Sequence, residues 1–429
     1  MAKTLTPLDA HALVESIAHQ ITGQTALTVT STADFVSVGE QILSYGTENV
    51  LNTISLITGK SYIAARPYSR RLRILNKLST GDFTHRFRKI SYYSKDPKSA
   101  GAFNTQLNGA NLGMGRDNQA QGTLDGGAGS AVPSMWEQNP AVPLEMNYTS
   151  MNEWNYTITV YEKALKQAFR SEEEFIHFIN GYFVEAQNDI ESEMEAMNYT
   201  ALLNFIACIY DLDAANPNKR VINVTSAYNA FFRTSYTSND LLTTYIKEFN
   251  QFFVTLVKTA SDYMTHRSAY YHWSPTKVVN GVNYTLLRHT PKEKQKLIMY
   301  GPVWKYMEAT VLPEIFNDQY LKLDNFEKVD YWQDFGAGAQ SDMQINITPA
   351  IPDLATPGYP QIAGTTVNTS VLGILFDEDA IAVDMQMEMA ATSPLEARKL
   401  YRNIVNHYSK GLINDPTENA ILFVMEDGN

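Results

Sequence analysis

The first part of the chain carries apolar residues at helical spacing but shows no obvious core of its own. Residues 8–21 and 35–57 each place apolar positions on one side of a predicted helix, and Gly46 marks a possible break in the second. A Thr- and Ser-rich extended linker, residues 24–33, separates the two helices. This string of elements is typical of an arm.

A long polar stretch, residues 99–142, holds Gly, Asn, Gln, Ala and Ser with few apolar anchors. A structureless loop of that length is rare inside a compact domain, so we expect it to be disordered or held by something outside the subunit. Residues 154–161 follow with period-two alternation of strongly β-forming residues. The loop is therefore predicted to leave and return through extended segments, like a projecting hairpin.

The clearest helical pattern begins at Ser171, which forms an S-x-x-E capping box with Glu174. Behind this cap the apolar positions keep one stripe from Phe175 to Ala201, and the helix is expected to continue to Cys208. A helix over this range would be roughly 55 Å long at 1.5 Å per residue, longer than most small domains are wide. It is therefore predicted to be a spine along which other elements lie.

The second half of the chain mixes helices with short strands, so the sequence predicts an α+β fold with interrupted sheets. Strands are expected on both sides of Asn280-Gly281, and residues 341–369 are expected to be mostly loop. We expect residues 396–408 to pair with the apolar segment 420–425. The remaining expected elements are helices at 238–265 and 302–312 and strands at 372–376 and 380–385, which flank an acidic turn.

Charged residues make up only 19% of the chain, below the usual quarter, so much of the surface is buried, alone or against partners. The net charge of −12 argues against a protein whose main task is to hold nucleic-acid phosphates. Cys208 is the only cysteine, which excludes an intrachain disulfide and indicates a reducing cytoplasm. We find no signal peptide and no apolar run long enough to cross a membrane.

No motif indicates catalysis, a cofactor or a metal, so we expect none of the three. Residues 58–61 contain the end of a phosphate-binding loop but lack its earlier glycine. The acidic turn Asp377–Asp379 has carboxylates that a hard cation could use. A solvated turn between two strands is the favoured interpretation, and cation binding stays open.

A basic strip lies between the arm and the polar stretch. We favour pairing of these arginines with carboxylates of a neighbouring subunit, because the acidic excess supplies partners. The alternative is contact with DNA, which combines positive charge with aromatic stacking. The strip consists of Arg70, Arg71, Arg73, Arg86 and Arg88.

The order of parts is arm, long hairpin-like loop, capped spine helix, α+β domain and a final return of strands. This order resembles the major capsid proteins of tailed bacteriophages, which share the HK97-like fold. Short sequence segments at residues 312–316, 329–332, 373–380 and 415–420 resemble those of short podophage-type members in particular. The resemblance covers nearly the whole chain and rests on the order of the parts and on these short segments.

The resemblance implies a non-enzymatic subunit that self-assembles into hexamers and pentamers of an icosahedral head around double-stranded DNA. It implies a separate scaffolding protein, since no long acidic N-terminal extension is present, and a portal. DNA would be touched only by weak non-specific contact. The protein would reside in the virion after assembly in the bacterial cytoplasm. The implied parts are an N-terminal arm (1–60), an E-loop with its base (61–165), a P-domain spine helix (166–220), an A domain (221–390) and closing P-domain strands (391–429).

Two rival interpretations remain. One is another virion structural protein, such as a portal or tail component, although a portal should show a long helical barrel segment. The other is an enzyme with a scattered active site in residues 270–390. That site would need a carboxylate pair such as Asp377 and Glu314 to converge.

Overall fold

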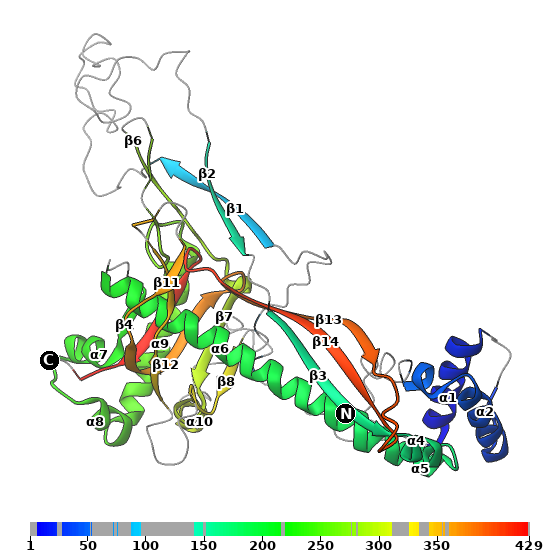
Figure 1. Cartoon of the computed structure of the whole chain (residues 1–429). Coiled ribbons are helices and arrows are strands. Elements are labelled where there is room, and N and C mark those ends of the chain that lie inside the picture. The colour runs from blue at the N-terminus through cyan, green and yellow to red at the C-terminus, as the bar shows by residue number, and fades with distance from the viewer. Residues whose placement is uncertain are drawn as a thin grey trace, which may run out of the picture.

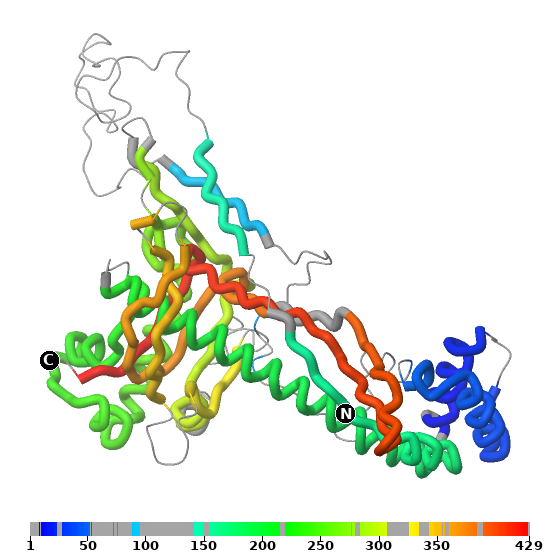
Figure 2. Tube along the Cα trace, viewed as in Figure 1, coloured from blue at the N-terminus to red at the C-terminus, as the bar shows by residue number. Residues whose placement is uncertain are grey.

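The structure is a computed structural model of the chain, and one long helix runs through its length (Figures 1 and 2). Its mixture of helices and mainly antiparallel sheets confirms the predicted α+β class. No helix among the described residues is long and apolar enough to span a membrane. The described residues are 7–23, 28–51, 53, 72, 75, 87–95, 141–148, 152–215, 219–275, 277–279, 282–310, 326–333, 343–353, 355–356 and 360–427.

The spine is helical from Glu172 to Ala215, longer than the stripe predicted. Its first helix, α5 (Glu172–Ile179), starts at Ser171, whose hydroxyl accepts a hydrogen bond from the amide of Glu174. A five-residue π-helix, η3 (Asn180–Val184), then leads into α6 (Glu185–Ala215). The apolar positions of the predicted stripe are buried or half-buried on both sides of the π-helix. The two ends of the spine face two separate cores.

The first core joins the arm to the start of the spine. The arm helices α1 (Pro7–Thr22) and α2 (Thr32–Ser44) pack beside α4 (Glu162–Ala168) and α5. Fully buried Phe35 lies with its ring centroid 5.7 Å from that of Phe175. The second arm helix ends near Gly46, whose positive φ of 105° breaks it as predicted. The arm thus shares a core with the spine and does not form one alone.

A three-stranded antiparallel sheet, ordered β13-β14-β3, lies along the spine (Figure 1). Its strands are β3 (Asn152–Tyr161), β13 (Ile381–Thr392) and β14 (Tyr401–Asn414). The predicted pairing of 396–408 with 420–425 was wrong, because β14 pairs with β13 and β3. The turn after β14 sends the next strand, β15 (Ala420–Met425), into a different sheet.

That other sheet has six strands and forms the second core. Its order is β4-β15-β12-β7-β8, with β9 pairing to β12, and all six residues of β15 are buried. Gly373 of β12 lies so close to β7 that a Cβ there would meet the carbonyl oxygen of Ile298 at 2.9 Å. The remaining strands are β4 (Val221–Asn223), β7 (Gln295–Tyr300), β8 (Phe326–Val329), β9 (Gln344–Ile347) and β12 (Val367–Asp377).

Helices pack around the six-stranded sheet, and two sequence expectations need correction there. The helix expected over 238–265 is two helices, because a full capping box between Thr237 and Asp240 starts a short helix that ends before a second one. Within residues 341–369, where mostly loop was expected, the described part also contains short strands that pair with each other or with the sheet. The elements are α7 (Val224–Phe232), α8 (Ser238–Thr243), α9 (Ile246–Thr265), η4 (Lys292–Lys294), α10 (Gly301–Thr310), β10 (Ala350–Pro352) and β11 (Gln361–Ala363).

A hairpin projects from the body (Figures 1 and 2). Its strands β1 (Phe87–Lys95) and β2 (Val142–Tyr148) pair antiparallel on either side of the polar stretch. The predicted projecting hairpin is therefore present at its base, although the return strand is β2 and not residues 154–161. β1 also pairs with β6 (Val282–Thr285), which pairs with β5 (Lys277–Val279) across the predicted turn. Residues 96–140 lie outside the described part of the chain.

Candidate functional site at the base of the hairpin

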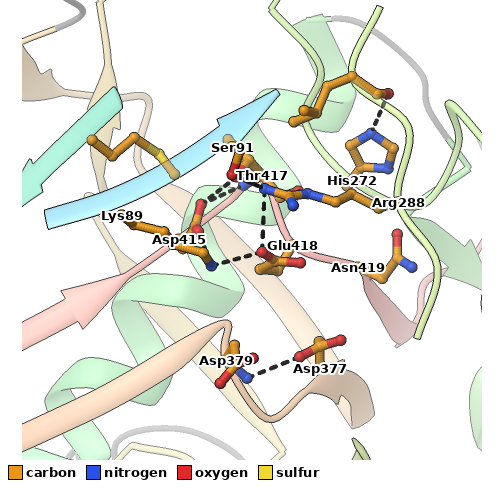
Figure 3. Close-up of polar contacts among 12 residues, drawn as sticks. Lys89, Ser91, His272, Arg288, Asp377, Asp379, Asp415, Thr417, Glu418 and Asn419 are labelled. Atoms are coloured by element: carbon orange, nitrogen blue, oxygen red, sulfur yellow. Dashed lines mark hydrogen bonds and ion pairs between the residues drawn. The ribbon is translucent and has the colours of Figure 1, made fainter. Parts of the chain in front are cut away.

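A cluster of buried ion pairs joins the hairpin to the body of the subunit (Figure 3). We call it the anchor cluster. Three segments far apart in the chain meet there: strand β1, the segment between β6 and β7, and the turn between β14 and β15. Its members are Lys89, Ser91, Arg288, Asp415, Thr417 and Glu418.

Lys89 of β1 is held between two carboxylates of the turn. Its Nζ lies 2.5 Å from Oδ2 of Asp415 and 2.6 Å from Oε1 of Glu418. The Asp415 side chain is 0% exposed and that of Lys89 is 19% exposed. A buried carboxylate without a partner is strongly destabilising, so the ammonium group of Lys89 stabilises this turn only while the hairpin stays in place.

Arg288 makes the second connection. Its Nη2 lies 3.2 Å from Oε1 of Glu418 and donates to the hydroxyl of Ser91 at 2.8 Å. Lys89 and Ser91 are two residues apart on one strand, so their side chains point to the same face of the hairpin. The cluster therefore holds one face of β1 with two cations and two carboxylates, which balance formally.

The turn itself is held firmly by its own hydrogen bonds. Oδ1 of Asp415 accepts from the amide of Thr417 at 2.9 Å and from its hydroxyl at 2.7 Å, a local bonding pattern that Asp favours in turns. The backbone amide of Asp415 donates to the carbonyl of Ala380, and the amide of Trp273 donates to that of Pro416. The segment Asp415–Ala420, already noted in the sequence, thus contacts the hairpin, both sheets and residues 270–290.

Burial and charge act in opposite directions on the pKa values of the cluster. Burial lowers the pKa of Lys89, but Asp415 and Glu418 outweigh it and raise that pKa above its usual 10.5. Burial raises the pKa of Glu418, and the nearby cations Lys89 and Arg288 only partly offset this. Burial, with the same two carboxylates, also raises the pKa of Tyr148, so its hydroxyl stays neutral. Lys89 therefore remains charged throughout the physiological range.

His272 lies fully buried beside the cluster (Figure 3). Its Nδ1 and Nε2 each lie 2.9 Å from a backbone carbonyl oxygen, those of Tyr270 and Leu286. Burial lowers its pKa to about 4, and the positive charges of Arg288 and Arg220 add to this, although the two carbonyl contacts act in the opposite direction. The imidazole is therefore neutral at pH 7, when it can donate to only one of the two carbonyls.

The acidic turn Asp377–Asp379, for which the sequence left cation binding open, has protein partners. Asp377 accepts from the hydroxyl of Thr290 at 2.6 Å and from the amide of Asp379 at 2.9 Å. Lys294 lies 3.1 Å from a carboxylate oxygen of Glu378. Within the described ranges no three His, Cys, Asp or Glu side chains are grouped to hold a metal ion. These contacts favour the interpretation as a structural turn.

Of the predicted basic strip, the structure describes Arg88 alone. Its Nη2 lies 2.8 Å from Oε2 of Glu145 on β2, in an exposed pair on the outer side of the hairpin. Arg70, Arg71, Arg73 and Arg86 lie outside the described residues. So does Glu314, the partner that the enzyme interpretation needs for Asp377.

Sequence reasoning missed the anchor cluster. Lys89 directly follows Arg88 at the end of the basic strip, and nothing in the sequence separates it from that exposed arginine. The available signal was its period-two spacing with Ser91 on a strand, which places both on one face. The position of the acidic partners more than three hundred residues later in the chain could not be read from the sequence.

Comparison with known proteins decides the family. Residues 119–424 match the profile of the family described as Phi29-like phage major capsid protein. The chain belongs to this family. The match confirms the resemblance to podophage-type major capsid proteins, and it gives the chain the structural role of a major capsid protein of the virion.

Solved phage capsids are similar to this major capsid protein at low sequence identity. The capsid structure of Staphylococcus phage Andhra has 11% identity and a TM-score of 0.48, covering 85% of this chain and 86% of that one. The mature capsid of bacteriophage PhiM1 has 8% identity and a TM-score of 0.38, covering 86% and 91%. The capsid of Cyanophage P-SCSP1u has 14% identity and a TM-score of 0.36, covering 86% and 93%. No curated protein matches the sequence.

Proposed function

We propose that this major capsid protein assembles into the hexamers and pentamers of an icosahedral head around double-stranded DNA, in the cytoplasm of the bacterial host. The observation that carries the proposal is the family match over residues 119–424. The arm, projecting hairpin, spine helix and sheets follow one another in the order that the HK97-like resemblance implies. The described carboxylates near Asp377 hold a turn, which supports a structural role without catalysis.

We propose the same five parts as the resemblance implies, with three strands reassigned by the strand pairing. The N-terminal arm (1–60) and the spine (166–220) keep their ranges. β3, at the end of the E-loop range 61–165, and β13, at the end of the A-domain range 221–390, join β14 in the P-domain sheet. β15, in the closing range 391–429, belongs to the A-domain sheet.

The anchor cluster has a mechanical role in this proposal. A hairpin that reaches another subunit must leave the body in a fixed direction, and among the described residues the apolar packing at its base is a small satellite core of five residues. The ion pairs of Lys89 and Arg288 with the turn supply the missing constraint. Because ion pairs require short distances between particular atoms, they fix the direction of the hairpin more strictly than apolar contacts do.

The basic strip remains proposed as an intersubunit contact. The Arg88–Glu145 pair is exposed on both sides, so it contributes less than about 1 kcal/mol to the fold and Arg88 is available to another partner. If the strip pairs with neighbouring carboxylates, replacing Arg86 and Arg88 by Gln lowers the yield of empty shells, and most strongly at low salt, where the pairs are least screened. If it binds DNA instead, empty shells form normally and only DNA retention falls.

The further partners follow from the same role: other copies of the chain, a separate scaffolding protein, a portal, and DNA through weak non-specific contact. The deciding experiment is assembly of the purified chain, alone and with a co-expressed scaffolding protein, followed by mass photometry and electron microscopy. Ring-shaped capsomers or closed particles are the expected products. A chain that stays monomeric under both conditions would contradict the proposal.

A further inference from the structure

A further buried cation, Arg220, lies outside the anchor cluster. It stands between the end of α6 and the first residue of β4, and it is fully buried. Its carbonyl accepts a hydrogen bond from the amide of Leu422 in β15 at 2.7 Å, so the sheet of the second core fixes its backbone. A guanidinium does not lose its proton inside a protein. The fold therefore encloses a permanent positive charge.

The carboxylate that the described structure places beside this guanidinium is that of Asp213. Its Oδ1 lies 3.5 Å from Nε of Arg220, and the same oxygen accepts from the backbone amide of Arg220 at 3.3 Å. Among the described residues, Nε, Nη1 and Nη2 of Arg220 find no hydrogen-bond partner. Buried polar atoms in folded proteins nearly always have one. The donors of Arg220 are therefore left to a partner that the chain does not supply.

The other ionisable groups near Arg220 do not balance its charge. Burial lowers the pKa of Arg220, and Asp213 opposes this without cancelling it. Burial raises the pKa of the Cys208 thiol to about 12 and lowers that of the His272 imidazole to about 4. Both groups are close enough to be influenced by the charge of Arg220, and both are neutral at pH 7. Neither supplies a negative charge.

The chemistry of the guanidinium defines what the partner must be. Its five N–H donors form a planar fork, so two nitrogens can donate to one acceptor. A water molecule could accept these hydrogen bonds but would leave the charge uncompensated. An anion does both, and its attraction to a cation is strongest where the surroundings have a low dielectric constant.

We propose that Arg220 binds a small inorganic anion, of the size of chloride, inside the folded subunit. Because Arg220 is fully buried, neither a DNA phosphate nor a side chain of another molecule reaches its nitrogen atoms. Nearby Cys208 belongs with Leu212 and Trp273 to a small buried apolar cluster, which excludes bulk water. A monatomic halide needs little more room than one water molecule. The proposal concerns the subunit alone and does not depend on assembly.

The first test is denaturant unfolding of the free subunit at constant ionic strength, with gluconate progressively replaced by chloride. The unfolding equilibrium constant should fall at least about tenfold and then level off as the site fills. Arg220→Met should lose this dependence. Lys219→Met, the same change at the neighbouring exposed lysine, should keep it. Equal chloride dependence in the two variants, or none in the wild type, would overturn the proposal.

The second test needs no variant, so it holds even if Arg220→Met does not fold. Crystals of the wild-type subunit grown in sodium bromide should show an anomalous bromine peak within hydrogen-bond distance of the Arg220 nitrogen atoms. A water molecule in that place would refute the proposal. A bromide peak without chloride-dependent unfolding would mean an adventitious ion only, and would refute it as well. Arg220→Lys keeps the charge but loses the fork, so its chloride dependence should be weaker than that of the wild type.

Discussion

Replacing Lys89 by Met should release the hairpin from the body. Met has a similar length and no charge, so the change removes the ammonium group and little else. The variant leaves Asp415 fully buried without its cation, while Glu418 keeps Arg288. Removing one partner of a buried pair costs about 3–5 kcal/mol. The lower end, about 3 kcal/mol, applies here because Lys89 is partly exposed and one pair survives.

The cost should appear as local opening of β1. The hairpin base contributes only a small satellite core, so it can separate while both main cores stay folded. Native-state hydrogen exchange of the β1 amides measures this opening directly. A change of about 3 kcal/mol is on the order of a hundredfold faster exchange. Amides of α9, inside the second core, should be unchanged.

Two further variants separate the ion pair from other effects. Arg88→Met lies on the same strand but breaks only an exposed pair, so it should change opening by less than about 1 kcal/mol. Asp415→Asn combined with Lys89→Met removes the unpaired buried charge, and the two changes should be coupled by at least about 1 kcal/mol. Unchanged β1 exchange in Lys89→Met, or simple additivity in the double variant, would refute a stabilising role for the pair.

Three other predictions concern pH, the spine and the polar stretch. The pKa of His272 is about 4 in the folded chain and 6.5 in the unfolded chain, so the unfolded chain binds the proton first as the pH falls. The free energy of unfolding should therefore fall by about 3 kcal/mol between pH 6.5 and pH 4. His272→Gln should reduce this pH dependence, measured by denaturant titration at several pH values. Ile190→Asp places a charge at a buried position of α6, so it should destabilise the subunit by several kcal/mol and prevent assembly. Glu191→Gln on the same helix should be tolerated. Equal solubility of the two variants would argue against burial of Ile190. Residues 99–142 should gain hydrogen-exchange protection only on assembly, and strong protection in free subunits would contradict that.

Local signals were read correctly where the chain decides its own conformation. The hydroxyl of Ser171 caps the spine as its spacing with Glu174 predicts, and the strands on either side of Asn280-Gly281 pair with each other. Gly46 ends an arm helix through a positive φ that glycine adopts easily. In each case residues within one or two turns of each other supply the interaction, so the sequence pattern contains it.

Long-range choices could not be read in the same way. The strand pairing of β14 depends on the turn at Asp415, which contacts three distant segments. The carboxylate of Asp415 pairs with Lys89 and its amide donates to the carbonyl of Ala380. The carbonyl of the next residue, Pro416, accepts from the amide of Trp273. The π-helix at 180–184 is a local backbone change that no residue type in the segment indicates. The anchor cluster depends on burial, which separates Lys89 from the exposed Arg88 beside it.

The spine holds two cores apart as well as joining them. Between Ala186 and Met197 it contributes no side chain to either core in the described structure. Ile190 is buried there outside both cores, and polar contacts lie beside it, with Asp189 accepting from the hydroxyl of Tyr156 and Glu193 paired with Lys410. Two apolar units linked in this way do not melt as one, so heating should give two calorimetric transitions, with a van't Hoff enthalpy well below the calorimetric one. One melting temperature therefore cannot describe this subunit, and the arm end can unfold and refold while the A domain stays intact.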